Sequence, residues 1–265
     1  MFVSLLVFLA CGAVTGVIAG LLGVGGGIVV VPILVTILPM LDTPAEHVQH
    51  LALGTSLASI VITSISSTRS QHKRGAVHWD IVKRITPGIL IGTFVGSIIA
   101  SYLPMGFLRA FFVCFLFFVS FQMFSNYRPP ASRDMPGLKG TMGAGGVIGM
   151  VSSFVGIGGG TLSVPFMTFC NVPVHEAVGT SSAIGFPIAV AGTIGYIVGG
   201  WGKPGLPELT LGYVHLWALL GLACASFCTA PIGVKLSHAL PTAKLKKVFA
   251  VFLLFMAVRM LLSIL

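Results

Sequence analysis

Two glycine-rich stretches carry the chemistry that this sequence offers. Residues 21–32 read LLGVGGGIVVVP, and residues 154–165 read FVGIGGGTLSVP. Both lie in apolar surroundings, where unpaired backbone N–H groups are tolerated only if protein or a cavity satisfies them. Glycine has no side chain, so a ligand can approach its backbone closely. A helix that starts at such a run offers free N–H groups and a positive dipole end, which together favour an anion.

Hydroxyl groups near the glycine runs extend the predicted anion site. The motifs HLALGTS at 50–56 and HEAVGTS at 175–181 place a threonine and a serine near the start of the segment after each run. Such hydroxyls cap helices or donate to an oxyanion, and both roles stay open. The residues expected to bind substrate are Gly25, Gly26, Gly27, Thr55, Ser56, Gly158, Gly159, Gly160, Thr161, Thr180 and Ser181. The residues expected to break the helices are Gly23, Pro32, Gly156 and Pro165. The alternative reading of the glycines is tight helix packing through small residues.

Two histidines occupy equivalent positions, four residues before each GTS. His50 and His175 are candidates for proton coupling, because an intramembrane histidine is a functional hypothesis by default. The alternative is an interfacial position with bonds to carbonyls or water. His47 and His50 are spaced i, i+3, but no carboxylate or cysteine completes a metal site, so no metal and no cofactor are expected. HExxH and GxSxG motifs are absent from the sequence, and an enzyme is not expected.

The composition places these motifs in a membrane. Of 265 residues, 55% are hydrophobic and 8% are charged, and the mean hydropathy is +1.03. That leaves too little polar surface for a soluble globule, and apolar runs of about twenty residues recur. The net charge of +9 sits in loops, where it orients the chain, so no nucleic-acid partner is expected. The first segment lacks a basic flank and reads as a retained span rather than a signal peptide.

The motifs recur in the same order, which divides the chain into two repeats. Repeat 1 covers residues 1–125 and repeat 2 covers residues 139–265, joined by a linker at 126–138. Each repeat reads as a span, a glycine break, a short apolar piece of about twelve residues and three further spans. The sequence therefore predicts an all-α polytopic membrane protein with about five helical segments in each repeat. Whether the short piece is re-entrant or a kinked part of a span stays open.

The charges predict that the two repeats lie in the membrane with opposite orientations. The basic residues between the third and fourth segments of repeat 1 are Arg69, Lys73, Arg74, Lys83 and Arg84. The equivalent loop at 200–211 holds only Lys203 with Glu208. The next loop at 103–107 is nearly uncharged, whereas its counterpart carries Lys235, Lys244, Lys246 and Lys247. The positive-inside rule then places the linker in the cytoplasm and both termini in the periplasm. Inverted repeats with broken helices are typical of secondary transporters.

The residues GLLGVGGGIVVVPIL and GIGGGTLSVPFMTF, each followed by GTS, resemble the paired motifs of the sulfite exporter TauE/SafE family. The resemblance covers nearly the whole chain. It implies a bacterial inner-membrane permease that moves sulfite, sulfoacetate or related organosulfonates. The residues alone predict only that the substrate is an anion, and the resemblance implies that this anion is a sulfur oxyanion.

The sequence thus predicts a permease for a small sulfur-containing anion, working by alternating access as the two halves rock about the glycine motifs. Its expected partners are the anion and the lipid bilayer, and no oligomeric state is indicated. One alternative is a passive anion channel. Another is a membrane assembly or metal-handling protein that uses His47, His50 and the cysteines.

Overall fold

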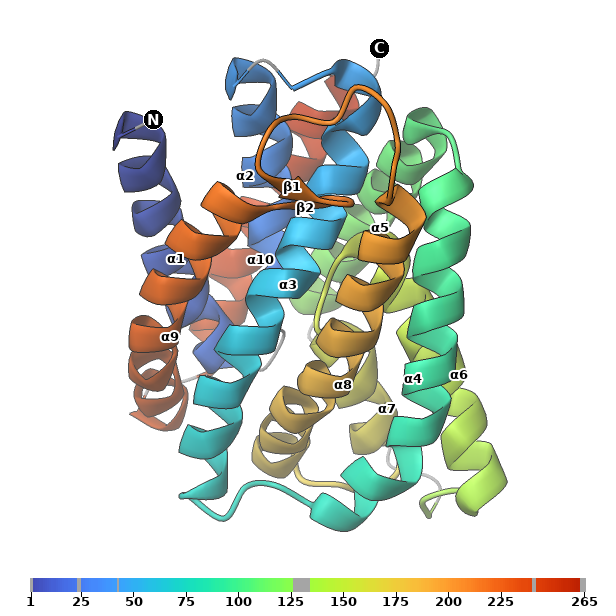
Figure 1. The fold of residues 1–265 in the computed structure, drawn as a ribbon. Coiled ribbons are helices and arrows are strands. Elements are labelled where there is room, and N and C mark those ends of the chain that lie inside the picture. The colour runs from blue at the N-terminus through green and yellow to red at the C-terminus, as the bar shows by residue number, and fades with distance from the viewer. Residues whose placement is uncertain (1, 23–24, 42, 126–133, 240–241, 263–265) are drawn as a thin grey trace.

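The computed structural model describes residues 2–22, 25–41, 43–125, 134–239 and 242–262, and almost all of them are helical (Figure 1). Gly23 and linker residues 126–133 lie outside the described part. The first half contains α1 (Phe2–Leu22), α2 (Gly27–Ile37), the 3-10 helix η1 (Leu38–Leu41), α3 (Ala45–His72), α4 (Trp79–Tyr102) and α5 (Met105–Ser125). The second half contains α6 (Leu138–Val155), α7 (Gly160–Phe169), α8 (Val174–Gly200), β1 (Thr210–Leu211), β2 (Val214–His215), α9 (Leu216–Ala239) and α10 (Thr242–Leu262).

The apolar runs of the sequence form helices of membrane-spanning length. Five helices of the described chain are long and apolar enough to cross a bilayer: α3, α4, α5, α8 and α9. The shorter apolar stretches Leu5–Leu21, Gly27–Leu41 and Phe249–Leu262 add parts of α1, α2 and α10. Many large apolar side chains on the outer helices are exposed. Such a surface suits lipid, and the predicted all-α polytopic membrane protein is confirmed.

The outer helices of each half pack against the other half. α1 lies along α9, α6 lies along α4, and α5 packs on α10, while α3 and α8 contact each other between these pairs. In Figure 1, α1 and α3 run from the top of the view downwards, and α6 and α8 run upwards. The first residues of α1 and the last residues of α10 lie at the same end. The two halves are therefore interlocked rather than placed side by side.

Glycines allow the close contacts between these helices. A Cβ atom at Gly16 of α1 would lie 2.6 Å from the carbonyl oxygen of Ser226 in α9. A Cβ atom at Gly88 of α4 would lie 1.9 Å from the carbonyl oxygen of Met142 in α6. No side chain fits at such distances, so the backbones touch, as small residues permit at membrane helix interfaces. Packing through small residues thus accounts for these glycines of the spans.

Candidate anion site at the crossing of two glycine breaks

Each glycine run turns the chain back on itself. Gly26, with φ of 78°, precedes α2, and Gly159, with φ of 75°, precedes α7. A Cβ atom at Gly26 would lie 2.9 Å from the carbonyl oxygen of Thr15 in α1, and one at Gly159 would lie 3.5 Å from the side chain of Ile148 in α6. These partners stand eleven positions earlier, which is about 16 Å along a straight helix. The chain must therefore reverse at both runs, so each short helix starts beside the helix that precedes it.

The first break, at residues 25–27, meets the second break, at residues 156–160, and we call their contact the glycine crossing. A Cβ atom at Gly25 would lie 3.2 Å from the Cα atom of Gly158, and one at Gly27 would lie 2.1 Å from the carbonyl oxygen of Gly156. The Ser56 hydroxyl, from α3, donates to that same carbonyl at 2.7 Å. The structure therefore brings together glycines of both predicted motifs and one of the predicted hydroxyls. Only residues without a side chain allow two backbone segments to touch in this way.

The first turns of α2 and α7 leave backbone donors unused. The carbonyl of each left-handed glycine accepts from the third and fourth N–H groups that follow it, at 2.8–3.2 Å. The N–H groups before these have no intrahelical acceptor, as at any helix start. Among the described residues, no acceptor binds the backbone N–H groups of the first two residues of each helix, which are Gly27, Ile28, Gly160 and Thr161. Two positive helix ends therefore lie near each other with free donors.

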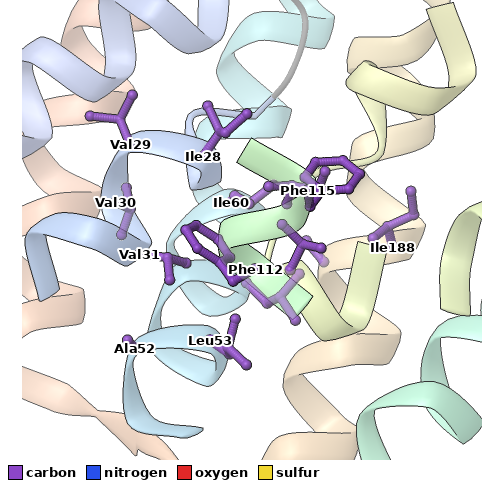
Figure 2. Close-up of a cluster of buried hydrophobic side chains, with 14 of the residues drawn as sticks. Ile28, Val29, Val30, Val31, Ala52, Leu53, Ile60, Phe112, Phe115 and Ile188 are labelled. Carbon is purple, nitrogen blue, oxygen red and sulfur yellow. The ribbon is translucent and has the colours of Figure 1, made fainter. Parts of the chain in front are cut away.

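Apolar side chains surround the crossing. Ile60 of α3 reaches both Gly25 and Gly27, and Ile188 of α8 reaches Gly159. Figure 2 shows these isoleucines together with α2, α3 and α5 side chains around the first break. This packing buries most of the glycine runs, and electrostatic attraction is stronger in such a low-dielectric environment. An anion that reached the free N–H groups would therefore be held more strongly than at a solvated helix end.

The prolines lie within the short helices. Pro32 and Pro165 are each the sixth residue of their helix, and α2 and α7 continue through them. The expectation that they break the helix is not met, because the chain has already reversed at the preceding glycines. Gly156 does end a helix: it follows α6 with φ of 69°, and its N–H donates to the Ser152 carbonyl at 2.8 Å. The equivalent Gly23 is outside the described residues.

The GTS threonines bind loops of the opposite half. The backbone N–H of His215 donates to the Thr55 Oγ1 at 2.9 Å, and that of His78 donates to the Thr180 Oγ1 at 3.0 Å. Both threonine oxygens thus act as acceptors in a structural contact. Ser181 donates to the carbonyl of Val178 in its own helix at 2.9 Å. Donation from these three side chains to a substrate stays a prediction, whereas Ser56 lies at the glycine crossing.

The two histidines of the HxxxGTS motifs differ in environment. His50 is 5% exposed, stacks on the Tyr213 ring with centroids 4.9 Å apart, and its Nε2 lies 3.2 Å from the Leu103 carbonyl oxygen. His175 is exposed, as the second residue of α8, whereas His50 is the sixth residue of α3. His50 stands about a turn and a half from Ser56 along α3, so it lies away from the crossing. Proton coupling through these histidines stays a prediction.

The two ring systems of the His47–His50 pair have polar neighbours in the structure. His47 contacts the carbonyl of Pro204 at 3.1 Å and Glu46 at 3.4 Å. The described residues contain no group of three or more His, Cys, Asp or Glu side chains that could hold a metal ion.

His215 directly precedes α9 and binds Thr55 of the opposite half. Its burial predicts how the stability of the protein depends on pH. Its Nδ1 accepts the N–H of Ala218 at 3.3 Å, and burial lowers its pKa. The unfolded chain therefore binds a proton that the folded chain excludes, and stability falls as the pH drops below about 6.5. We expect the melting temperature of the purified protein to fall from pH 7.5 to pH 5.5, and to fall less in His215→Asn. An equal drop in both proteins would contradict this assignment.

Three buried hydroxyl groups lie near the second break, and the repeated motif predicted only one of them. Ser152 in α6 is fully buried, and its Oγ lies 3.5 Å from a Cβ position at Gly159. Thr161 and Ser163 in α7 are also buried, and none of the three hydroxyls has a hydrogen-bond partner within the described chain. Only Thr161 was expected at the site. The contrast between GGGTLSVP and GGGIVVVP was the signal that could have found Ser163.

The comparisons with known proteins agree with this architecture. The family model of the sulfite exporter TauE/SafE matches residues 8–260. A probable membrane transporter protein of Haemophilus influenzae is 38% identical over 265 residues, which is 99% of this chain and 100% of the relative. Probable membrane transporter proteins of Bacillus subtilis and Methanocaldococcus jannaschii are 26% and 27% identical, covering 90% and 86% of this chain and 91% and 84% of their own lengths. No solved structure matches the chain. The chain belongs to the sulfite exporter TauE/SafE family, a family of membrane transporters.

Proposed function

We propose that this protein is a secondary transporter for a small sulfur-containing anion, such as sulfite or an organosulfonate. The observation that carries the proposal is the meeting of two helix starts, whose free N–H groups lie under an apolar cover. Backbone amides bind an oxyanion without a lysine or arginine side chain, so the anion can also leave readily. The family description supports sulfur as the central atom of that anion.

We also propose that the two halves are inverted repeats. Equivalent residues make equivalent contacts: Thr55 accepts from His215 as Thr180 accepts from His78. The packing of α1 on α9 likewise corresponds to the packing of α6 on α4. Transport then follows alternating access about the glycine crossing. Because each half holds an outer helix of the other, the moving units take helices from both halves.

The charge distribution supports an orientation in the membrane. Arg69, Lys73 and Arg74 are exposed at or just beyond the end of α3, and Lys83 and Arg84 are exposed at the start of α4. We propose that this end faces the cytoplasm of a bacterial inner membrane, and that both termini face the periplasm.

Reconstitution into liposomes tests the function. Radiolabelled sulfite or sulfoacetate outside the vesicles should accumulate transiently when the same unlabelled anion is loaded inside. Such counterflow requires a carrier that alternates between two faces, and a passive channel does not produce it. Protein-dependent flux that neither saturates nor shows counterflow would establish the channel instead. Lack of flux above empty liposomes for every sulfur anion tried would overturn the proposal.

A further inference from the structure

The two glycine breaks share a backbone geometry but differ in their side chains. Counting from the first glycine of each run, Thr161 corresponds to Ile28, and Ser152 corresponds to Ala19. Ser163 likewise corresponds to Val30. At all three positions the second break carries a hydroxyl where the first carries an alkyl group. The two sides of the crossing therefore offer different chemistry to a ligand.

The hydroxyls of the second break are buried donors without acceptors. Ser152 and Ser163 are 0% exposed and Thr161 is 6% exposed, and none of their three hydroxyl groups has a hydrogen-bond partner within the described chain. The Ser152 Oγ lies 3.5 Å from a Cβ position at Gly159, so this hydroxyl faces the reversal itself. A buried polar group without a partner is costly, and an accepting ligand would remove that cost.

Polar groups near the first break are already satisfied. Thr15 donates to the carbonyl of Gly12 at 3.1 Å, and Thr63 and Ser226 share a hydrogen bond of 2.6 Å. The Ser56 hydroxyl lies beside Gly27, and it already donates to the Gly156 carbonyl at 2.7 Å. Ile28 is fully buried, and Ile60 contacts the first glycine run. Among the described residues, this side therefore offers the apolar surface of Ile28 and Ile60, and its unused donors are backbone N–H groups.

We propose that the oxyanion head of the substrate binds at the second break, and that the first break holds the organic part of the same molecule. The substrate is then a short organic anion such as an alkanesulfonate, rather than inorganic sulfite or sulfate. Sulfate presents oxygens in every direction, and sulfite presents a hydrated sulfur lone pair opposite its three oxygens, so burying either anion against isoleucine would cost desolvation energy. An alkanesulfonate presents oxygens on one side and C–H groups on the other. This inference rests on the proposed function of the crossing as an anion site.

Binding measurements on the purified full-length protein test the inference. We expect ethanesulfonate to bind at least about tenfold more tightly than sulfite or sulfate. Ser152→Ala and Thr161→Val should each weaken ethanesulfonate binding about tenfold, because each removes a hydrogen bond to a charged group. Thr168→Val is the matched control, because it removes a hydroxyl from the far end of the same helix α7, where that hydroxyl donates to the Pro165 carbonyl at 3.0 Å. This variant should change the affinity by about twofold or less.

The outcomes separate this inference from the proposed function. Equal affinity of the wild-type protein for sulfite and ethanesulfonate overturns the inference, as do unchanged affinities in both Ser152→Ala and Thr161→Val. In either case the crossing remains an anion site. Wild-type protein that binds none of the three anions overturns the proposed function as well. Melting temperatures of the variants show that they are folded, and Thr161→Ser, which keeps the hydroxyl, should retain wild-type affinity if Thr161→Val fails to fold.

Discussion

Replacing Gly27 with alanine is expected to abolish transport while leaving the protein helical and inserted. Gly27 is already in helical conformation, so alanine causes no backbone strain at this position. Its Cβ atom would lie 2.1 Å from the carbonyl oxygen of Gly156, which forces the two reversals apart. A misplacement of about 1 Å at a functional site costs on the order of 100-fold in activity. We therefore expect the initial rate of anion uptake into proteoliposomes to fall by about 100-fold.

Gly143→Ala is the matched control for this prediction. Nothing lies within 4 Å of a Cβ atom at Gly143 in α6, and alanine favours helix more than glycine does. This variant should transport like the wild type. If Gly27→Ala also transports at the wild-type rate, the contact between the two breaks is not part of the transport site.

Replacing Gly16 with leucine is expected to destabilise the packing of α1 on α9. A Cβ atom at this position would lie 2.6 Å from both the Cα atom and the carbonyl oxygen of Ser226, so the α9 backbone blocks it. The two helices must separate, and overpacking of this kind typically costs about 1–3 kcal/mol. We expect the melting temperature in detergent to fall clearly, with aggregation at the temperature where the wild type is stable.

Val14→Leu serves as the control for the helix interface. Val14 lies on the same helix two residues away, and its side chain is 56% exposed. A larger apolar side chain on this surface should leave the melting temperature nearly unchanged. Comparable losses in both variants would show that the effect comes from α1 itself and not from its contact with α9.

The membrane class and the position of the breaks were predictable from the sequence. Apolar length identifies the spans, and glycine runs within them mark the places where a helix can stop. The recurrence of GxGGG predicted that the two runs act together, and the structure brings Gly25 and Gly158 into contact. The direction of the chain after the break was not predictable, because eleven apolar residues suit a re-entrant segment and a kinked span equally well.

Other features depend on contacts that no local pattern encodes. Apolar helices do not specify their neighbours, so the pairing of α1 with α9 could not be read from residue types. The roles of Thr55 and Thr180 depend on loops more than a hundred residues away. His50 and His175 match in sequence, but α3 has several more residues before its histidine than α8 has. That extra turn buries one histidine and exposes the other.

The interlocking of the two halves has a consequence for the order of events during synthesis. α1 comes first among the described helices, yet its main partner is α9, which is made only after α2–α8. Until then the glycine face of α1 contacts lipid, and α2 has no second reversal against which to dock. We therefore expect that the first half does not fold independently. A chain that stops in the linker would leave α1 without its main partner, unless the second half is supplied separately in the same membrane.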